Sequence, residues 1–185
     1  MMKYIYISLF ILCSTATMKA QEKYSTKTGT ITFEASVPSF EEVKATHSNV
    51  GAILKSSNGE FAALALVKGF RFKLALMEEH FNENYMESTA YPKAVVKGKL
   101  SNFNISELSE NETEFLLKGN ITMHGTTRAL EEIVRVSLTG DSINLKTEFV
   151  LNPEDFNIKI PKIVANKIAD EVNITANFSL SKSDL

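Results

Sequence analysis

The sequence has few residues of several types on which many small stable proteins and enzymes depend. Its 185 residues include one cysteine, no tryptophan, four prolines and eight glycines, and neither sign of charge dominates, since the formal net charge is −2. One cysteine excludes an intramolecular disulfide framework. A nucleic-acid partner is disfavoured, because no block of Lys and Arg is available to face phosphates. What the sequence does contain is a globular share of apolar residues, 44%, with 12 phenylalanines.

The first twenty residues have the pattern of a secretory signal peptide. A basic start at Lys3 precedes the apolar run 4–12, which is far shorter than the roughly 20 residues that cross a bilayer. We predict cleavage after Ala20, with cleavage after Ala16 as the alternative. The chain then divides into a leader, 1–20, and one domain, 21–185, which is periplasmic or secreted. Cys13 leaves with the leader, and the loss of Lys3 and Lys19 takes the net charge from −2 to −4.

Alternation of apolar and polar residues recurs along the rest of the chain. It is typical of strands with one apolar face, and turn sequences such as Asn58-Gly59 and Thr139-Gly140-Asp141 separate the runs. The runs indicate eight or nine long antiparallel strands, hence an up-and-down barrel or a two-sheet sandwich. The alternating segments are 31–37, 61–67, 70–76, 115–123, 143–151 and 172–180.

Two segments break the alternation. Met77, Phe81 and Tyr85 are spaced four apart and predict a short helix within 77–91, and 163–170 predicts a further helical turn. The inward faces of the strands mix many phenylalanines with small residues. Either the small residues leave a hollow along the axis or the phenylalanines fill the space, and composition alone favours neither. The small inward residues are Ala35, Ala63, Ala65, Gly119 and Ala176.

Three segments resemble the YceI-like family of lipid- and polyisoprenoid-binding proteins. They are 72–98 (FKLALMEEHFNENYMESTAYPKAVVKG), 119–128 (GNITMHGTTR) and 149–161 (FVLNPEDFNIKIP), in the family's order and over nearly the whole mature chain. The segment 81–88 departs from the family pattern. The resemblance implies an all-β fold, an elongated, eight-stranded antiparallel lipocalin-like barrel with one or two short helices. It also implies a long-chain amphiphile as ligand, such as a polyisoprenoid, a polyprenyl quinone or a fatty-acid derivative.

We combine this resemblance with the alternation to predict the binding residues. His80, Asn84, Tyr85 and His124 are expected at the polar head group, at a mouth of the barrel. No cofactor is expected beyond a co-purifying lipid. Transient contact with a membrane surface and a homodimer are both compatible with the sequence. The residues expected to line the lumen are Phe33, Phe61, Phe70, Phe72, Leu74, Phe81, Tyr85, Phe115, Ile121, Met123, Phe149, Ile174 and Phe178.

Catalytic patterns are scarce. The three histidines form no H-E-x-x-H motif and no nucleophile elbow, Walker loop or dinucleotide fingerprint is present, so we predict no catalytic residue and no metal site. The adjacent carboxylates Glu131 and Glu132 would face opposite ways on a strand, and we interpret both as surface charge. Two alternatives stay open: an enzyme that acts on a lipophilic substrate in the same cavity, and a solid barrel that serves as a protein-interaction module.

Overall fold

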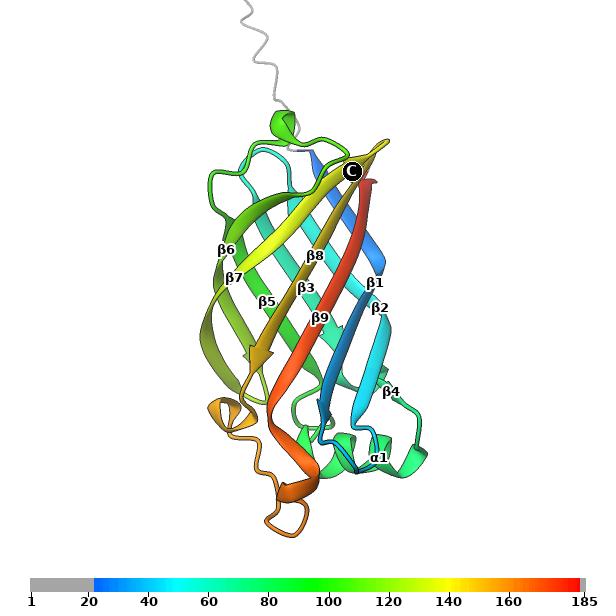
Figure 1. Cartoon of the computed structure of the whole chain (residues 1–185). Coiled ribbons are helices and arrows are strands. Elements are labelled where there is room, and N and C mark those ends of the chain that lie inside the picture. The colour runs from blue at the N-terminus through cyan, green and yellow to red at the C-terminus, as the bar shows by residue number, and fades with distance from the viewer. Residues whose placement is uncertain (1–21, 184–185) are drawn as a thin grey trace, which may run out of the picture.

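The computed structural model describes residues 22–183 and shows a tall barrel of antiparallel strands (Figure 1). The predicted leader, 1–20, lies outside the described residues. In chain order the strands are β1 (Lys23–Ser36), β2 (Lys44–Lys55), β3 (Glu60–Leu66), β4 (Arg71–Phe72), β5 (Lys93–Leu100), β6 (Thr113–Met123), β7 (Thr126–Thr139), β8 (Ser142–Leu151) and β9 (Ile168–Ser183).

The barrel is closed by eight of these strands in an up-and-down arrangement. Each long strand pairs antiparallel with its neighbours in the chain, and β1 completes the ring by pairing with both β2 and β9. β4 is a two-residue strand that pairs with the lower part of β2. The predicted eight-stranded antiparallel barrel is therefore confirmed. Within residues 22–183, closure of the ring gives every long strand a partner on both sides.

Most of the helical segments lie at the lower end of the barrel in the view of Figure 1, while a short turn at 105–107 lies at the upper end. Helix α1 (Ala75–His80) runs directly into a wider π-helical turn, η2 (Phe81–Tyr85), so the predicted helix is confirmed but begins two residues early. A 3₁₀ turn, η5 (Ala165–Lys167), confirms the helical turn expected in 163–170. Three further 3₁₀ turns are η1 (Val67–Gly69), η3 (Ile105–Glu107) and η4 (Pro153–Phe156). Within residues 22–183, no helix is long and apolar enough to span a membrane.

The prediction of a strand over 70–76 was wrong. Only Arg71 and Phe72 pair with β2, and the chain then turns into α1. The carboxylate of Glu78 provides the physical reason, because it accepts hydrogen bonds from the Phe72 backbone N–H at 3.2 Å and from the Arg71 guanidinium at 2.8 Å. These bonds fold the helix back onto the short strand. Leu74 therefore precedes the helix and is 40% exposed.

The interior differs between the two ends of the barrel. At the upper end, large side chains fill the space between the strands, and Phe115 packs against Phe103 with ring centroids 5.5 Å apart. At the lower end the same ring of strands encloses a hollow. Composition left open whether the interior is hollow or filled. The structure has a filled core in the upper half and a hollow in the lower half. The largest fully buried residues of the upper half are Leu54, Leu100, Val136, Ile143, Leu145 and Leu180.

Candidate ligand-binding cavity

The lower half of the barrel encloses a cavity of about 520 Å³, within the usual range for a small-molecule site. Side chains from β1, β3 and β5 to β9 form its wall, and α1 and η2 lie across its lower end. Ala35, Ala63, Ala65 and Ala176 all line it, so the expected room along the axis does come from small residues. Gly119 does not line it, because this glycine instead lets β5 and β6 approach each other at Gly98.

Most of the predicted lumen residues line the cavity. Leu74 does not, because the chain has already left the strand, and Phe115 does not, because it belongs to the solid upper core. Whether the others contact a ligand stays a prediction. The predicted residues that line the cavity are Phe33, Phe61, Phe70, Phe72, Phe81, Tyr85, Ile121, Met123, Phe149, Ile174 and Phe178.

Four phenylalanines form an aromatic cluster between the barrel wall and the helical segment. Phe81 of η2 stacks on Phe33 of β1 at 5.2 Å between ring centroids and meets Phe72 at 5.1 Å and Phe70 at 5.8 Å. Phe33 also contacts Phe70 and Phe72. Such offset and edge-on ring pairs add to the free energy of apolar burial. The cluster holds the helical segment against the lower end of the cavity.

The residues predicted for the head group are divided by the structure. His80 and Tyr85 line the cavity at its lower end, and burial raises the pKa of the Tyr85 phenol. Asn84 is exposed and lies off the cavity. His124 is buried at the lower end of the barrel. Its Nδ1 lies 2.9 Å from the backbone oxygen of Phe156, and its ring packs on Tyr91. Head-group contact stays a prediction for His80 and Tyr85 only.

Glu132 is a cavity residue that the sequence analysis missed. It lies on β7 between the buried Leu130 and Val134 and faces the lumen, which corrects its interpretation as surface charge. Burial raises the pKa of the Glu132 carboxyl. Its neighbour Glu131 does lie outside, where it pairs with Lys118 at 3.5 Å. The alternation of Leu130, Val134 and Val136 was the signal in the sequence that places position 132 inside.

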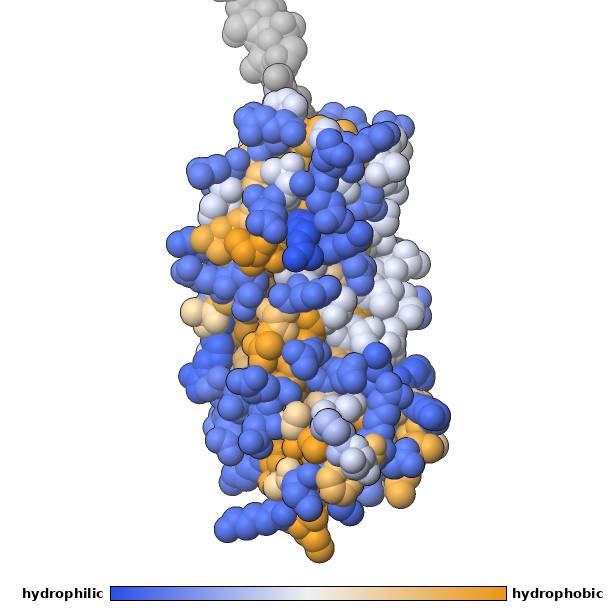
Figure 2. All heavy atoms as spheres, in the orientation of Figure 1, coloured by the Kyte–Doolittle hydropathy of each residue, from blue (hydrophilic) through white to orange (hydrophobic). Residues whose placement is uncertain are grey.

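The wall opens partly along one seam next to Glu132. The β7–β8 ladder runs from Thr139–Ser142 to Val134–Thr147 and stops there, although both strands continue toward the lower end. Figure 1 shows the two strands diverging below this point. Ile133 and Val150, about half exposed, lie on either side of the seam, and Figure 2 shows hydrophobic side chains at the surface along this part of the molecule.

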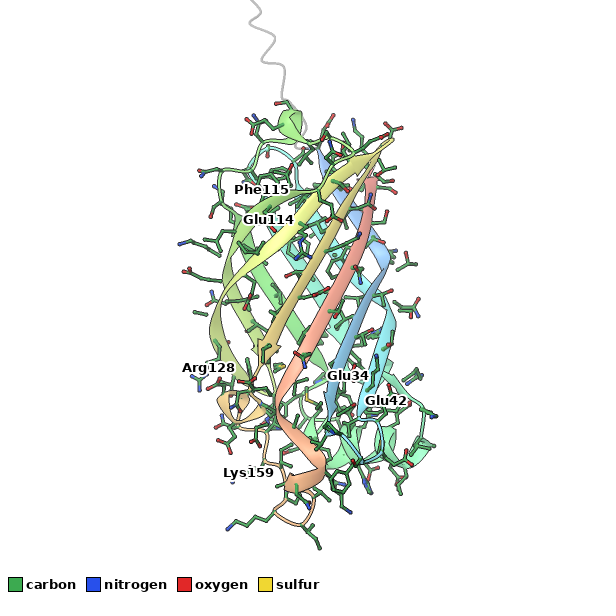
Figure 3. The ribbon with its side chains drawn as sticks, viewed as in Figure 1. Glu34, Glu42, Glu114, Phe115, Arg128 and Lys159 are labelled. Atoms are coloured by element: carbon green, nitrogen blue, oxygen red, sulfur yellow. The ribbon has the colours of Figure 1, made fainter. Side chains whose placement is uncertain are left out.

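The 3₁₀ turn η4 closes the lower end of this seam. The Arg128 Nε of β7 donates to the backbone oxygen of Asp155 at 2.8 Å, and Asn157 donates to the Thr126 hydroxyl at 2.9 Å. Figure 3 shows Arg128 beside this turn. Pro153 of η4 also lines the cavity. The turn therefore bridges the two diverging strands and completes the wall.

The sequence matches the family described as the YceI-like domain over residues 14–180. The chain belongs to this family. The three segments that carried the resemblance meet at the lower end of this YceI-like domain: 72–98 runs from the end of β4 through α1 and η2 up into β5, 119–128 includes the β6–β7 turn, and 149–161 includes η4. Tyr91 fixes the hairpin turn in place, because a Cβ on Gly125 would lie 2.8 Å from its ring.

Solved structures share the fold of this YceI-like domain at low sequence identity. A polyisoprenoid binding domain from Saccharophagus degradans, implicated in plant cell wall breakdown, superposes with a TM-score of 0.76 at 11% identity, over 89% of this chain and 100% of that chain. Burkholderia cenocepacia BcnA gives a TM-score of 0.67 at 13% identity, covering 82% and 96%. A Campylobacter jejuni YCEI protein gives 0.62 at 10%, covering 80% and 90%. No curated protein sequence matches the chain.

Proposed function

We propose that the protein is an exported binding protein that holds the apolar chain of an amphiphile in the lower cavity and releases it unchanged. The observation that carries the proposal is the cavity itself, about 520 Å³ with walls built almost entirely from aliphatic and phenyl side chains. The Saccharophagus degradans domain of the same fold is described as polyisoprenoid binding. Polyisoprenoids, polyprenyl quinones and fatty-acid derivatives all have the chain that such a wall accepts.

The free energy of ligand transfer favours a protein that binds its ligand reversibly over one that holds it permanently. Each methylene buried from water is worth about 0.8 kcal/mol, so a chain of twelve carbons would gain about 10 kcal/mol. The same chain in a bilayer is already out of water, and its transfer into a dry lumen is therefore close to neutral. Such a cavity can take up its ligand from a membrane and return it with only a small net change in free energy.

Native mass spectrometry of the protein purified without detergent tests this proposal. We expect a co-purifying hydrophobic mass of several hundred daltons that organic extraction removes and that returns on incubation with lipid vesicles. The same spectra report whether the protein is a monomer or a dimer. A chain that never acquires a lipid would contradict the proposal. Conversion of the added lipid into a product of different mass would instead favour an enzyme.

The lower end of the barrel also has the surface expected of a mouth that meets a bilayer. Four exposed apolar side chains surround it: Phe40 of the β1–β2 loop, Leu74, Leu76 of α1, and Ile163, which is 85% exposed. Figure 2 shows hydrophobic atoms at this end. Phe40 itself lines the cavity, as do neighbours of the other three. An apolar ligand that passes between these side chains and a membrane would avoid water.

We therefore predict that the double change Leu76→Ser and Ile163→Ser slows lipid uptake from vesicles. Removing two apolar anchors at the mouth should reduce the uptake rate about 30-fold, since each is worth about 1 kcal/mol at a membrane interface. Uptake of a fluorescent lipid measured by stopped flow checks the rate. Leu64→Ser is the matched control, because Leu64 is exposed on the barrel wall away from the mouth. Equal rates in both variants would mean that the mouth does not contact the membrane.

A further inference from the structure

The inner end of the cavity has two polar side chains that face each other across the β7–β8 seam. On β7, Glu132 is the last residue that lines the cavity before the strand enters the solid core at Val134. On β8, Thr147 is the corresponding residue, because it lines the cavity directly below the buried Leu145. Thr147 pairs with Val134, and Glu132 is the next inward residue along β7. The two side chains are therefore diagonal neighbours on the inner face.

This inner site presents hydrogen-bond acceptors. Within residues 22–183, the Glu132 carboxylate has no hydrogen bond and no ion pair, although burial already disfavours its charge. The Thr147 hydroxyl donates its proton to the Ile133 backbone oxygen at 2.8 Å, so its own oxygen is left to accept. Partial burial removes some of the water that would otherwise solvate this carboxyl. A ligand that donates hydrogen bonds would replace that lost solvation.

Charge separates the two ends of the cavity. Among the described residues that line it, Lys167 has the only fixed positive charge, and Lys167 is exposed on η5 at the lower end. His80 and Glu41 are also at that end. An anionic head group at the inner end would be desolvated next to Glu132 without a cation to offset it. The inner end therefore rejects phosphates and carboxylates and accepts N–H and O–H donors.

We infer that Glu132 and Thr147 bind the head group of the amphiphile, that the head is a hydrogen-bond donor such as an alcohol, amide or amine, and that the ligand lies head-inward with its chain toward the α1 mouth. This inference rests on the proposed function. It places the head group away from His80 and Tyr85, which then contact the end of the chain. The seam between β7 and β8 lies directly beside the head, and η4 covers its lower end.

Competition binding with three probes of one chain length tests the inference. Dodecylamine, dodecanol and dodecyl phosphate are each titrated against the fluorescent dye diphenylhexatriene, a hydrocarbon without a hydrogen-bond donor. Wild-type protein should bind the amine and the alcohol at least about tenfold more tightly than the phosphate. Glu132→Leu should weaken binding of the amine about 10- to 100-fold and leave the affinity for the dye unchanged. Glu132→Gln should bind the amine no more tightly than the alcohol, because it keeps a hydrogen-bonding group but has no charge to attract the ammonium group.

Glu131→Gln is the matched control, since Glu131 is next to Glu132 on the outer face and should leave all affinities unchanged. The inference is overturned if Glu132→Leu binds the amine as wild type does, or if the phosphate binds as tightly as the amine. It is also overturned if Glu132→Leu loses the dye and all probes equally, which would indicate a structural role. Failure of the wild-type protein to bind even the dye would contradict the proposed function itself.

Discussion

Ala63→Phe is expected to abolish retention of apolar ligands while the barrel still folds. Ala63 lies on the inner face of β3, where it pairs with Ala52 of β2 and Val96 of β5 and lines the cavity. A phenyl ring at this position projects into the hollow. If it excludes four methylenes of the ligand, the loss is about 3 kcal/mol, or about 200-fold in affinity. The ring fills empty space, so stability should not fall as it does when a solid core is overfilled.

Two measurements check this prediction. Native mass spectrometry should show the variant without the co-purifying lipid of wild type, and thermal unfolding should show a midpoint at or above that of wild type. Ala62→Phe is the matched control, because Ala62 faces outward between Ile53 and Lys97 on the same strand. The control should retain the lipid. Equal retention of lipid by the Ala63 variant would show that the ligand does not occupy this cavity.

Gly119→Ala is expected to lower the free energy of unfolding by about 3 kcal/mol, the upper range for forced overpacking. Gly119 of β6 pairs with Gly98 of β5, and the two strands cross closely there. A Cβ on Gly119 would lie 2.2 Å from the Lys97 carbonyl oxygen and 2.5 Å from the Cα of Gly98. Both atoms belong to the backbone, so neither can move aside without separating the strands. Leu117 and Ile121, two residues away on either side, line the cavity and would shift as well.

Urea denaturation of the variant measures this loss. Gly51→Ala provides the control, because Gly51 also lies in a strand but a Cβ there would have no neighbour closer than 4.0 Å. That change should be neutral or stabilise by up to about 1 kcal/mol, since alanine restricts the unfolded chain. A Gly119→Ala protein within about 0.5 kcal/mol of wild type would contradict the close approach of β5 and β6.

The faces of the strands could be predicted well from the sequence. Period-two alternation predicted β6, β8 and β9, and the four-residue spacing of Met77, Phe81 and Tyr85 predicted the helical segment and its cavity-facing side. The prediction failed over 70–76, because alternation continues there in the residues while Glu78 turns the chain. Phe115 shows a second limit. Alternation predicts that a side chain faces inward but not at which height along the barrel it lies.

The sequence by itself determined the family, the closed all-β fold and the apolar character of the interior, since these depend on local periodicity and on the order of recognisable segments. Only the tertiary structure decided where the interior is hollow, because that depends on the summed volumes of side chains that eight strands bring to one level. It also decided the role of Glu132. The alternation of β7 places this carboxylate inside, and the early end of the β7–β8 ladder leaves it beside Thr147 at the inner end of the cavity.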